Sequence, residues 1–250
     1  MLLLNLLFAL LGLLTGVLIN MLADELPARE RPGRPRCIQC RHQYPPLQWL
    51  ALGRRLWGDG RCPECGLPTR RRALLVEVLT AGIFAILPFF LEQPADLFFG
   101  AIYVAILILV IVTDLEHRLI LHVVTVPGIL VALAGSLFVS GNSLLFALLG
   151  ALLGFVVFFG FYWLGKLLFG PGALGFGDVT LATMMGAMVG FPAIVFALVL
   201  GIFLGGFLTF LLLATGRLSL RSHVAYGPYL AVAGIVVVVW GEGLLNWYLS

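Results

Sequence analysis

Two aspartates, Asp114 and Asp178, lie where charge is costly, because each is at an edge of a long apolar segment. A charged side chain costs roughly 2.5 to 3.5 kcal/mol at the centre of a membrane helix, so ionisable residues in such segments usually have a function. Two carboxylates that meet within a few ångströms tend to share one proton. One can then act as base on a water molecule while the other polarises a carbonyl group, which is the chemistry of aspartic proteolysis.

The residue types alone leave a second interpretation open, in which Asp178 caps a helix and Asp114 is an interfacial residue. The context of Asp178, Gly175-Phe176-Gly177-Asp178, favours the functional interpretation, because glycines let the backbone of a substrate come close. The chain has neither the glycine spacing of a dinucleotide site nor a Walker lysine, so the motif does not indicate phosphate binding.

The four cysteines of the chain form two Cys-x-x-Cys pairs, Cys37 with Cys40 and Cys62 with Cys65. Four thiolates in two such pairs are typical of a tetrahedral zinc site that is structural, since it has no open position for a substrate. Two disulfides or a redox pair are the alternatives. A surrounding segment rich in Arg, Pro and Gly cannot form a large core, so we expect zinc to supply much of its folding free energy.

The composition places these residues in a membrane protein. The 250 residues are 61% hydrophobic and 11% charged, and the mean hydropathy is +1.09. A soluble domain of this size would have too little polar surface to cover itself. Apolar runs of about 17 to 25 residues can cross a bilayer as helices.

Eight apolar segments predict eight transmembrane helices, so the expected fold class is an all-α polytopic membrane protein. The segments cover residues 2–22, 73–91, 97–113, 122–140, 143–169, 178–191, 193–215 and 226–247. Phe191-Pro192 is expected to separate the sixth helix from the seventh. The predicted division is a first helix (1–22), a zinc-binding loop (23–72) and a seven-helix membrane catalytic domain (73–250).

The basic residues predict the orientation. Eleven of the fifteen lysines and arginines lie in the segment 24–72, which the positive-inside tendency places in the cytoplasm. Both termini are then outside, and Asp114 and Asp178 both reach the cytoplasmic face. The cytoplasm is reducing, which disfavours disulfides. Arginines beside membrane helices contact lipid head groups, so we expect membrane lipid rather than nucleic acid as their partner.

The order of the motifs along the chain resembles the type IV prepilin peptidases, a family of membrane aspartic proteases with a GxGD motif. The matching pieces are Gly16-Val17-Leu18-Ile19-Asn20, the four-cysteine loop, Val76-Glu77-Val78-Leu79-Thr80, Asp114, Gly175-Phe176-Gly177-Asp178 and Tyr226-Gly227-Pro228. The resemblance implies a bacterial inner-membrane endopeptidase that cuts the basic leader from prepilin-like proteins of type IV pili or secretion systems.

The same resemblance implies roles for individual residues. Asp114 and Asp178 would be catalytic, and the residues expected along the substrate's approach are Gly175, Phe176, Gly177, Tyr226, Gly227 and Pro228. It also implies N-methylation of the new N-terminus with S-adenosylmethionine, for which the sequence predicts no residue. The chain departs from the family pattern in three places: Thr180 replaces a lysine, Leu121-His122 replaces Pro-Asp or Pro-Asn, and Glu25 replaces an arginine.

Other functions remain open from the sequence. A presenilin-like GxGD protease would cut inside membrane helices, and a zinc-anchored assembly scaffold would have no enzymatic activity. A transporter is the third alternative, in which the aspartates join His117, His122 or His223 in a metal site or a proton relay. Glu77 is expected to be a hydrated carboxylate near the start of its helix.

Overall fold

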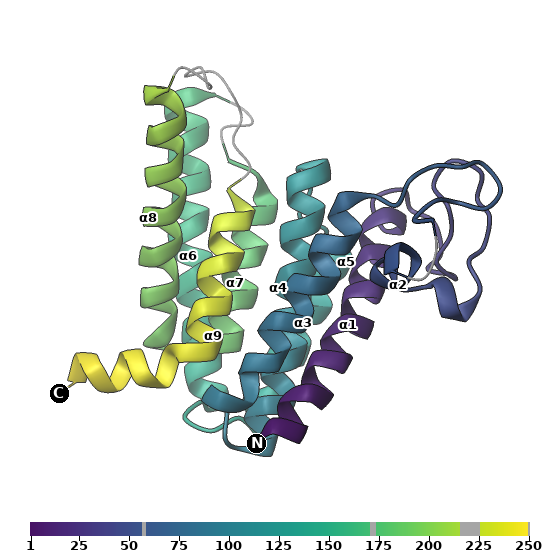
Figure 1. Cartoon of the computed structure of the whole chain (residues 1–250). Helices are drawn as coiled ribbons and strands as arrows, with labels where there is room; N and C mark the ends of the chain where they lie inside the picture. The colour runs from purple at the N-terminus through teal and green to yellow at the C-terminus, as the bar shows by residue number, and fades with distance from the viewer. Residues whose placement is uncertain (57–58, 171–173, 216–225, 250) are drawn as a thin grey trace. The chain divides into compact units, whose positions relative to one another are not determined.

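A computed structural model of the chain describes residues 1–56, 59–170, 174–215 and 226–249 (Figure 1). Within these ranges the regular structure is helical, and strand pairing is limited to two isolated bridges, Arg36 with Gln43 and Arg61 with Pro68. The chain divides into two compact units, Met1–Glu92 and Gln93–Ser250. The three-part division expected from the sequence remains a prediction.

All eight apolar helices expected from the sequence are present. They are α1 (Leu2–Glu25), α3 (Arg71–Phe90), α4 (Pro94–His117), α5 (His122–Gly135), α6 (Leu144–Phe169), α7 (Phe176–Val189), α8 (Ala193–Ala214) and α9 (Gly227–Leu249). Among the described residues, five helices are long and apolar enough to cross a membrane: α1, α3, α4, α6 and α8. The described parts of α5, α7 and α9 are shorter apolar helices, so the total of eight crossings remains a prediction.

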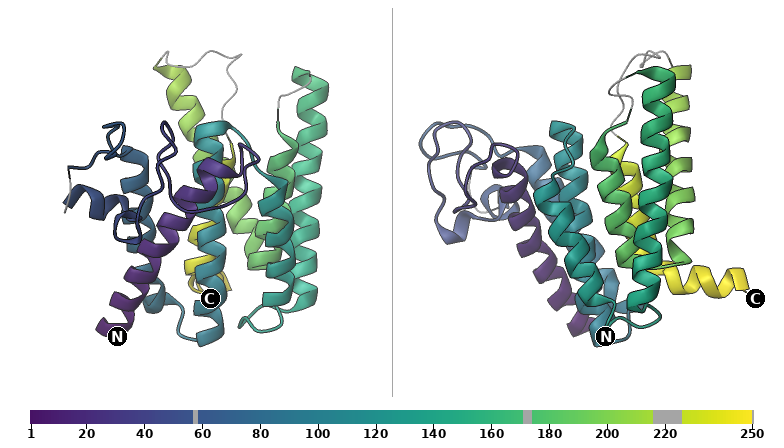
Figure 2. Two further views of the ribbon diagram at one scale, coloured as in Figure 1. Left: turned by 90° about the vertical axis from the view of Figure 1, so that its right-hand side faces the viewer. Right: turned by 180° about the vertical axis from the view of Figure 1, so that it is seen from behind.

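In the first unit, α1 and α3 pack along each other (Figure 2). A Cβ on Gly12 would lie 2.7 Å from the Cα of Ala81, and a Cβ on Gly16 would lie 2.7 Å from the Cα of Glu77. The two glycines, one helical turn apart, therefore let the helix backbones approach closely. Leucines of α1 remain exposed, among them Leu6, Leu10 and Leu14, as expected of a helix that faces lipid.

The segment between α1 and α3 contains two short helices that the sequence analysis did not predict. They are η1 (Pro46–Gln48) and α2 (Ala51–Leu56). Both follow the first cysteine pair, and α2 packs on α3.

In the second unit, α7 lies among α5, α6 and α9, and α4 packs on α5 and α9. The apolar residues in the middle of α7 are buried, including Val179, Leu181 and Met184, so this short helix is central to the unit. The chain leaves α7 at Val189 and enters α8 at Ala193, which confirms the predicted separation of the two helices. The candidate active site is formed by the C-terminal end of α4, which carries Asp114, and the N-terminal end of α7, which carries Asp178.

Candidate functional site

The structure brings the two predicted catalytic carboxylates together within the second unit. Asp114 is in the last turn of α4 and is 5% exposed, and Asp178 is in the first turn of α7 and is 7% exposed. The two side chains interact electrostatically. The backbones of Gly227 and Gly175 lie close to these carboxylates: a Cβ on Gly227 would lie 2.6 Å from Oδ2 of Asp114, and a Cβ on Gly175 would lie 3.3 Å from Oδ2 of Asp178. A helix N-terminus such as that of α7 also stabilises a carboxylate.

Two predicted site glycines are explained by packing within the chain. A Cβ on Gly177 would lie 2.7 Å from the Cβ of Ile120. A Cβ on Gly227 would lie 2.6 Å from Oδ2 of Asp114 and 2.9 Å from Cδ1 of Ile120. Ile120 thus holds the segment before α5 against both glycines. A role for Gly175 and Gly177 in admitting a substrate backbone remains a prediction.

The other predicted substrate-approach residues also lie near the aspartates. Tyr226 is half-buried and interacts electrostatically with Asp178, and Pro228 is buried. Phe176 is 45% exposed, and its ring meets the ring of His122 edge-on with centroids 6.1 Å apart. An exposed aromatic ring two residues before Asp178 is available to contact a bound peptide.

Two of the departures from the family pattern contact each other. The Thr180 hydroxyl donates to the Gly177 carbonyl at 2.9 Å, and its Oγ1 lies 3.4 Å from Nδ1 of His122. The Thr125 hydroxyl donates to Oγ1 of Thr180 at 3.3 Å. Since the single hydroxyl proton of Thr180 goes to Gly177, Nδ1 of His122 is the donor in their contact. The replacements at positions 122 and 180 therefore form one hydrogen-bonded group beside the GxGD turn.

The remaining histidines do not extend the site in the described part of the chain. His117 lies 3.9 Å from its neighbour Glu116, and His223 lies outside the described residues. Among the described residues, the group found to have metal-ligand geometry is the cysteine cluster. The geometry described thus gives no support to a metal-binding transporter site at the aspartates.

The four cysteines meet as the sequence predicted. Their Sγ atoms all lie within 4.8 Å of one another, with 3.6 Å between Cys37 and Cys65 and 3.6 Å between Cys40 and Cys62. Tetrahedral zinc with Zn–S bonds of about 2.3 Å separates its sulfurs by about 3.8 Å. A disulfide would require about 2.05 Å. The four donors therefore fit a zinc ion, and the cysteines are free thiols.

Two turns of the same design present the cysteines. In each, the N–H of the first cysteine, Cys37 or Cys62, donates at 2.8 Å to the carbonyl five residues later. The residue after the second cysteine has a positive φ in both turns, 58° at Arg41 and 69° at Gly66. We call residues 36–68, which contain both turns, the metal lobe.

The thiols carry charge unequally, as expected of four sulfurs crowded together. Burial raises the pKa of Cys62, but the backbone amides of Cys65 and Glu64 and the neighbouring thiols outweigh burial and lower the pKa to about 6. The His42 amide lowers the pKa of Cys40, but burial and the other three thiols raise it to about 12. A bound divalent cation would allow all four thiols to be deprotonated together, because thiols that coordinate a metal lose their protons.

Comparison with known proteins finds matches along most of the chain. Residues 101–210 match the model of the type IV leader peptidase family, and residues 10–90 match that of the bacterial peptidase A24 N-terminal domain. The prepilin leader peptidase/N-methyltransferase of Aeromonas hydrophila is 31% identical to the chain over 91% of the chain and 78% of its own length.

The chain belongs to the type IV leader peptidase family.

Further relatives carry the same name. The protein of Dichelobacter nodosus is 31% identical over 82% of the chain and 71% of its own length. That of Pseudomonas aeruginosa is 27% identical over 96% of the chain and 92% of its own length. No solved structure is significantly similar to the chain. The family predicted from the motifs is therefore confirmed, and both aspartates lie in the segment that matches the leader peptidase model.

Glu77 has a different role in this family member from the one that the sequence suggested. Its carboxylate accepts the backbone N–H groups of Ala51 at 2.8 Å and Leu52 at 2.9 Å, and the residue is only 1% exposed. The expectation of a hydrated carboxylate is wrong, because Glu77 satisfies the first turn of α2 instead. The partners are about 25 residues away in sequence, so no local pattern indicated them.

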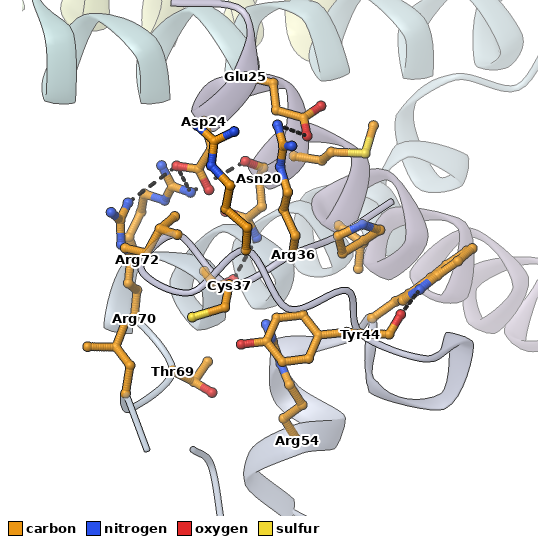
Figure 3. A pocket seen from close by; sticks show the side chains of 18 of the residues that line it. Asn20, Asp24, Glu25, Arg36, Cys37, Tyr44, Arg54, Thr69, Arg70 and Arg72 are labelled. Carbon is orange, nitrogen blue, oxygen red and sulfur yellow. Dashed lines mark hydrogen bonds and ion pairs between the residues drawn. The ribbon is translucent and has the colours of Figure 1, made fainter. Parts of the chain in front are cut away.

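The sequence analysis also missed a cavity of about 250 Å³ in the first unit (Figure 3). It lies between the end of α1, the metal lobe and the start of α3, within the segment that matches the N-terminal domain model. Glu25, one of the departures from the family pattern, lines it. Its carboxylate accepts the N–H of Gly33 at 2.9 Å and pairs with Arg36 at 3.2 Å.

Proposed function

We propose that the protein is a membrane aspartic endopeptidase that removes the leader of prepilin-like proteins. The observation that supports this most directly is the pair of buried carboxylates, Asp114 and Asp178, in a member of the leader peptidase family. The names of its relatives specify prepilin leaders as the substrate. Asp114 lies in the last turn of α4, and Asp178 lies in the first turn of α7.

The site supports hydrolysis by a shared-proton pair. One aspartate accepts a proton from the attacking water while the other, protonated, donates to the carbonyl of the scissile bond. Both carboxylates are buried, and the backbone of Gly227 packs closely against Asp114, so the packing restricts how far the two groups can move before the peptide arrives. This chemistry needs no covalent intermediate.

We place the site at the cytoplasmic face of the bacterial inner membrane. The arginine-rich segment 24–72 favours a cytoplasmic location for the metal lobe, which puts both termini outside if all eight apolar helices cross. Apolar helices with exposed leucines support contact with lipid. The leader of a substrate is then cut where its hydrophobic segment enters the membrane.

Two cofactors belong to the proposal. A structural zinc ion is held by Cys37, Cys40, Cys62 and Cys65, whose sulfur spacing suits tetrahedral coordination. The relatives are also named N-methyltransferases, and we include methylation of the new N-terminal amine of the mature pilin in the proposal. S-adenosylmethionine supplies the methyl group in this reaction.

The test of this function is cleavage of a synthetic prepilin by the full-length protein in liposomes, with the product mass read by mass spectrometry. We expect one cut at the leader boundary, and its loss in Asp114→Asn and in Asp178→Asn while both variants still insert into the membrane. Cleavage by both variants would reject the aspartate pair. A cut inside the hydrophobic segment would favour the presenilin-like alternative.

A further inference from the structure

The cavity of the first unit has walls from four parts of the chain. Asn20 and Asp24 come from the last turns of α1, Cys37 and Tyr44 from the metal lobe, Arg54 from α2 within that lobe, and Arg72 from the start of α3 (Figure 3). Its volume of about 250 Å³ is near the lower end of small-molecule sites, which run from roughly 300 to 1,000 Å³. The catalytic aspartates do not line it.

Asn20 presents an unpartnered acceptor to this cavity. The residue is 9% exposed, and its Nδ2 donates to the carbonyl of Ala73 at 3.0 Å. Because a carbonyl can only accept, this bond fixes which end of the amide is the oxygen. Oδ1 is buried without a partner in the described part of the chain. A buried acceptor of this kind costs about 1 to 3 kcal/mol unless something donates to it.

Arg54 offers the complementary group. Its guanidinium lies over the ring of Tyr44, 4.1 Å from the ring centroid, and its Nε is buried with no hydrogen-bond partner among the described residues. In Figure 3, Asn20 lies on the α1 side of the cavity and Arg54 beside the ring of Tyr44. A complementary ligand therefore carries an N–H donor for Asn20 and an acceptor for Arg54.

The other arginines of the cavity are neutralised by carboxylates, so the site does not select a simple anion. Asp24 pairs with both Arg70 and Arg72, at 3.3 and 3.0 Å, and Glu30 pairs with both Arg36 and Arg41. A phosphate or an anionic lipid head group would have to compete with these carboxylates. Interleaved charges of both signs suit a ligand that itself carries both signs.

We propose that this cavity binds the methyl donor S-adenosylmethionine, with Asn20 and Arg54 as binding residues. The proposal rests on the N-methylation part of the proposed function. The donor has an amino group on its purine, a carboxylate on its amino-acid end, and both positive and negative charges. The reaction breaks the S–CH₃ bond, leaves its electron pair on sulfur and forms an N–CH₃ bond to an amine that has lost a proton to water.

The metal lobe forms part of the same site. Tyr44, whose ring Arg54 covers, is buried in a small cluster with Cys37 and Cys62. Zinc therefore acts at a distance from the donor, by holding the wall that carries Tyr44. This gives the structural metal a consequence for the second activity.

The test is binding of S-adenosylhomocysteine, the unreactive product form, to the purified zinc-loaded full-length protein by calorimetry. We expect Asn20→Leu and Arg54→Met each to weaken binding roughly tenfold, with zinc content retained as the check on folding. Photocrosslinking of tritiated S-adenosylmethionine should label the wild-type cavity residues and decline in both variants. Arg54 is half-buried, so its variant tests the site even if Asn20→Leu fails to fold.

The chain supplies matched controls. Asn5 lies on the same helix as Asn20 and also has a buried oxygen without a partner among the described residues, but it is outside the cavity. Arg55 is the exposed neighbour of Arg54 and does not line the cavity. Asn5→Leu and Arg55→Met should bind the ligand as the wild type does.

The outcomes separate this proposal from the one on which it rests. Unchanged binding in both Asn20→Leu and Arg54→Met, or an equal loss in the controls, would overturn the cavity as the donor site. A wild-type protein that cleaves prepilin but neither binds the ligand nor methylates the product would overturn the methylation part of the proposed function. Absence of cleavage by the wild type would overturn the peptidase itself.

Discussion

The metal lobe and the aspartate site are built in opposite ways. All four cysteines of the proposed zinc site come from residues 36–68, in two turns whose hydrogen bonds join residues five positions apart. The aspartate site joins three distant parts of the chain: residues 114–120, the turn before α7 and Gly227. The first geometry is local and would be cross-linked by the proposed metal, and the second depends on helix packing.

The two sites should therefore be disrupted by different changes. Loss of metal removes the cross-link that fixes the lobe, but it removes no group from the aspartate site. A side chain added between packed helices should displace groups of the aspartate site and leave the metal lobe intact. The predictions below test this separation, beginning with the largest effect.

Removing the metal should unfold the lobe. Structural zinc contributes roughly 10 to 16 kcal/mol in zinc-finger peptides, far more than a lobe with this small a core can replace. Cys62→Ser should reduce bound zinc to background by elemental analysis and raise hydrogen exchange across residues 36–68. Amides of α7 should keep their protection. Unchanged zinc content would reject the cysteine cluster as the metal site.

Crowding the aspartate site should mainly affect catalysis. In Gly227→Ala the new Cβ would lie 2.6 Å from Oδ2 of Asp114, so the carboxylate must move. A displacement near 1 Å can cost about 10²-fold in rate, and we expect a fall of that order in kcat/KM for prepilin cleavage. Gly206→Ala is the control, because its Cβ would meet nothing within 4 Å. Equal rates for the two variants would contradict the packing described.

The sequence predicted the helices and the cysteine cluster well, because long apolar runs and paired cysteines are local signals. It also predicted that Asp114 and Asp178 meet, since counting crossings places both at one face. It could not predict that Gly227 packs against Asp114, that His122 contacts Thr180 or that Glu77 binds the start of α2. These contacts join segments far apart in the chain, and no residue pattern specifies which distant segment fills a given space.

Weakening the contact between α2 and α3 should destabilise the first unit moderately. Glu77→Gln loses the charge and one of two acceptors for the N–H groups of Ala51 and Leu52, at a cost of about 1.5 to 3 kcal/mol. The measurement is the thermal midpoint of the purified protein. Glu64→Gln, at a more exposed position in the metal lobe, should change the midpoint little. A midpoint equal to that of wild type would show that Glu77 does not anchor α2.

The smallest effect is expected at the paired departures from the family pattern. Thr180→Val removes the hydroxyl that joins His122 to Gly177, which should cost about 1 kcal/mol and reduce cleavage a few-fold. Thr183→Val removes a hydroxyl that bonds only within its helix, to Val179, and is the control. Because His122 and Thr180 share one bond, His122→Ala should add little to Thr180→Val. Fully additive losses would mean that the two act independently.

The measurement that tests the central claim most directly is cleavage by Asp114→Asn, Asp178→Asn and the double variant, with kcat compared for all three. Residues that act as one unit give grossly non-additive losses. Each single change should reduce kcat by at least about 10²-fold, and the double variant should be no slower than the slower single variant. Independent, multiplicative losses, or substantial activity in either single variant, would contradict catalysis by a carboxylate pair.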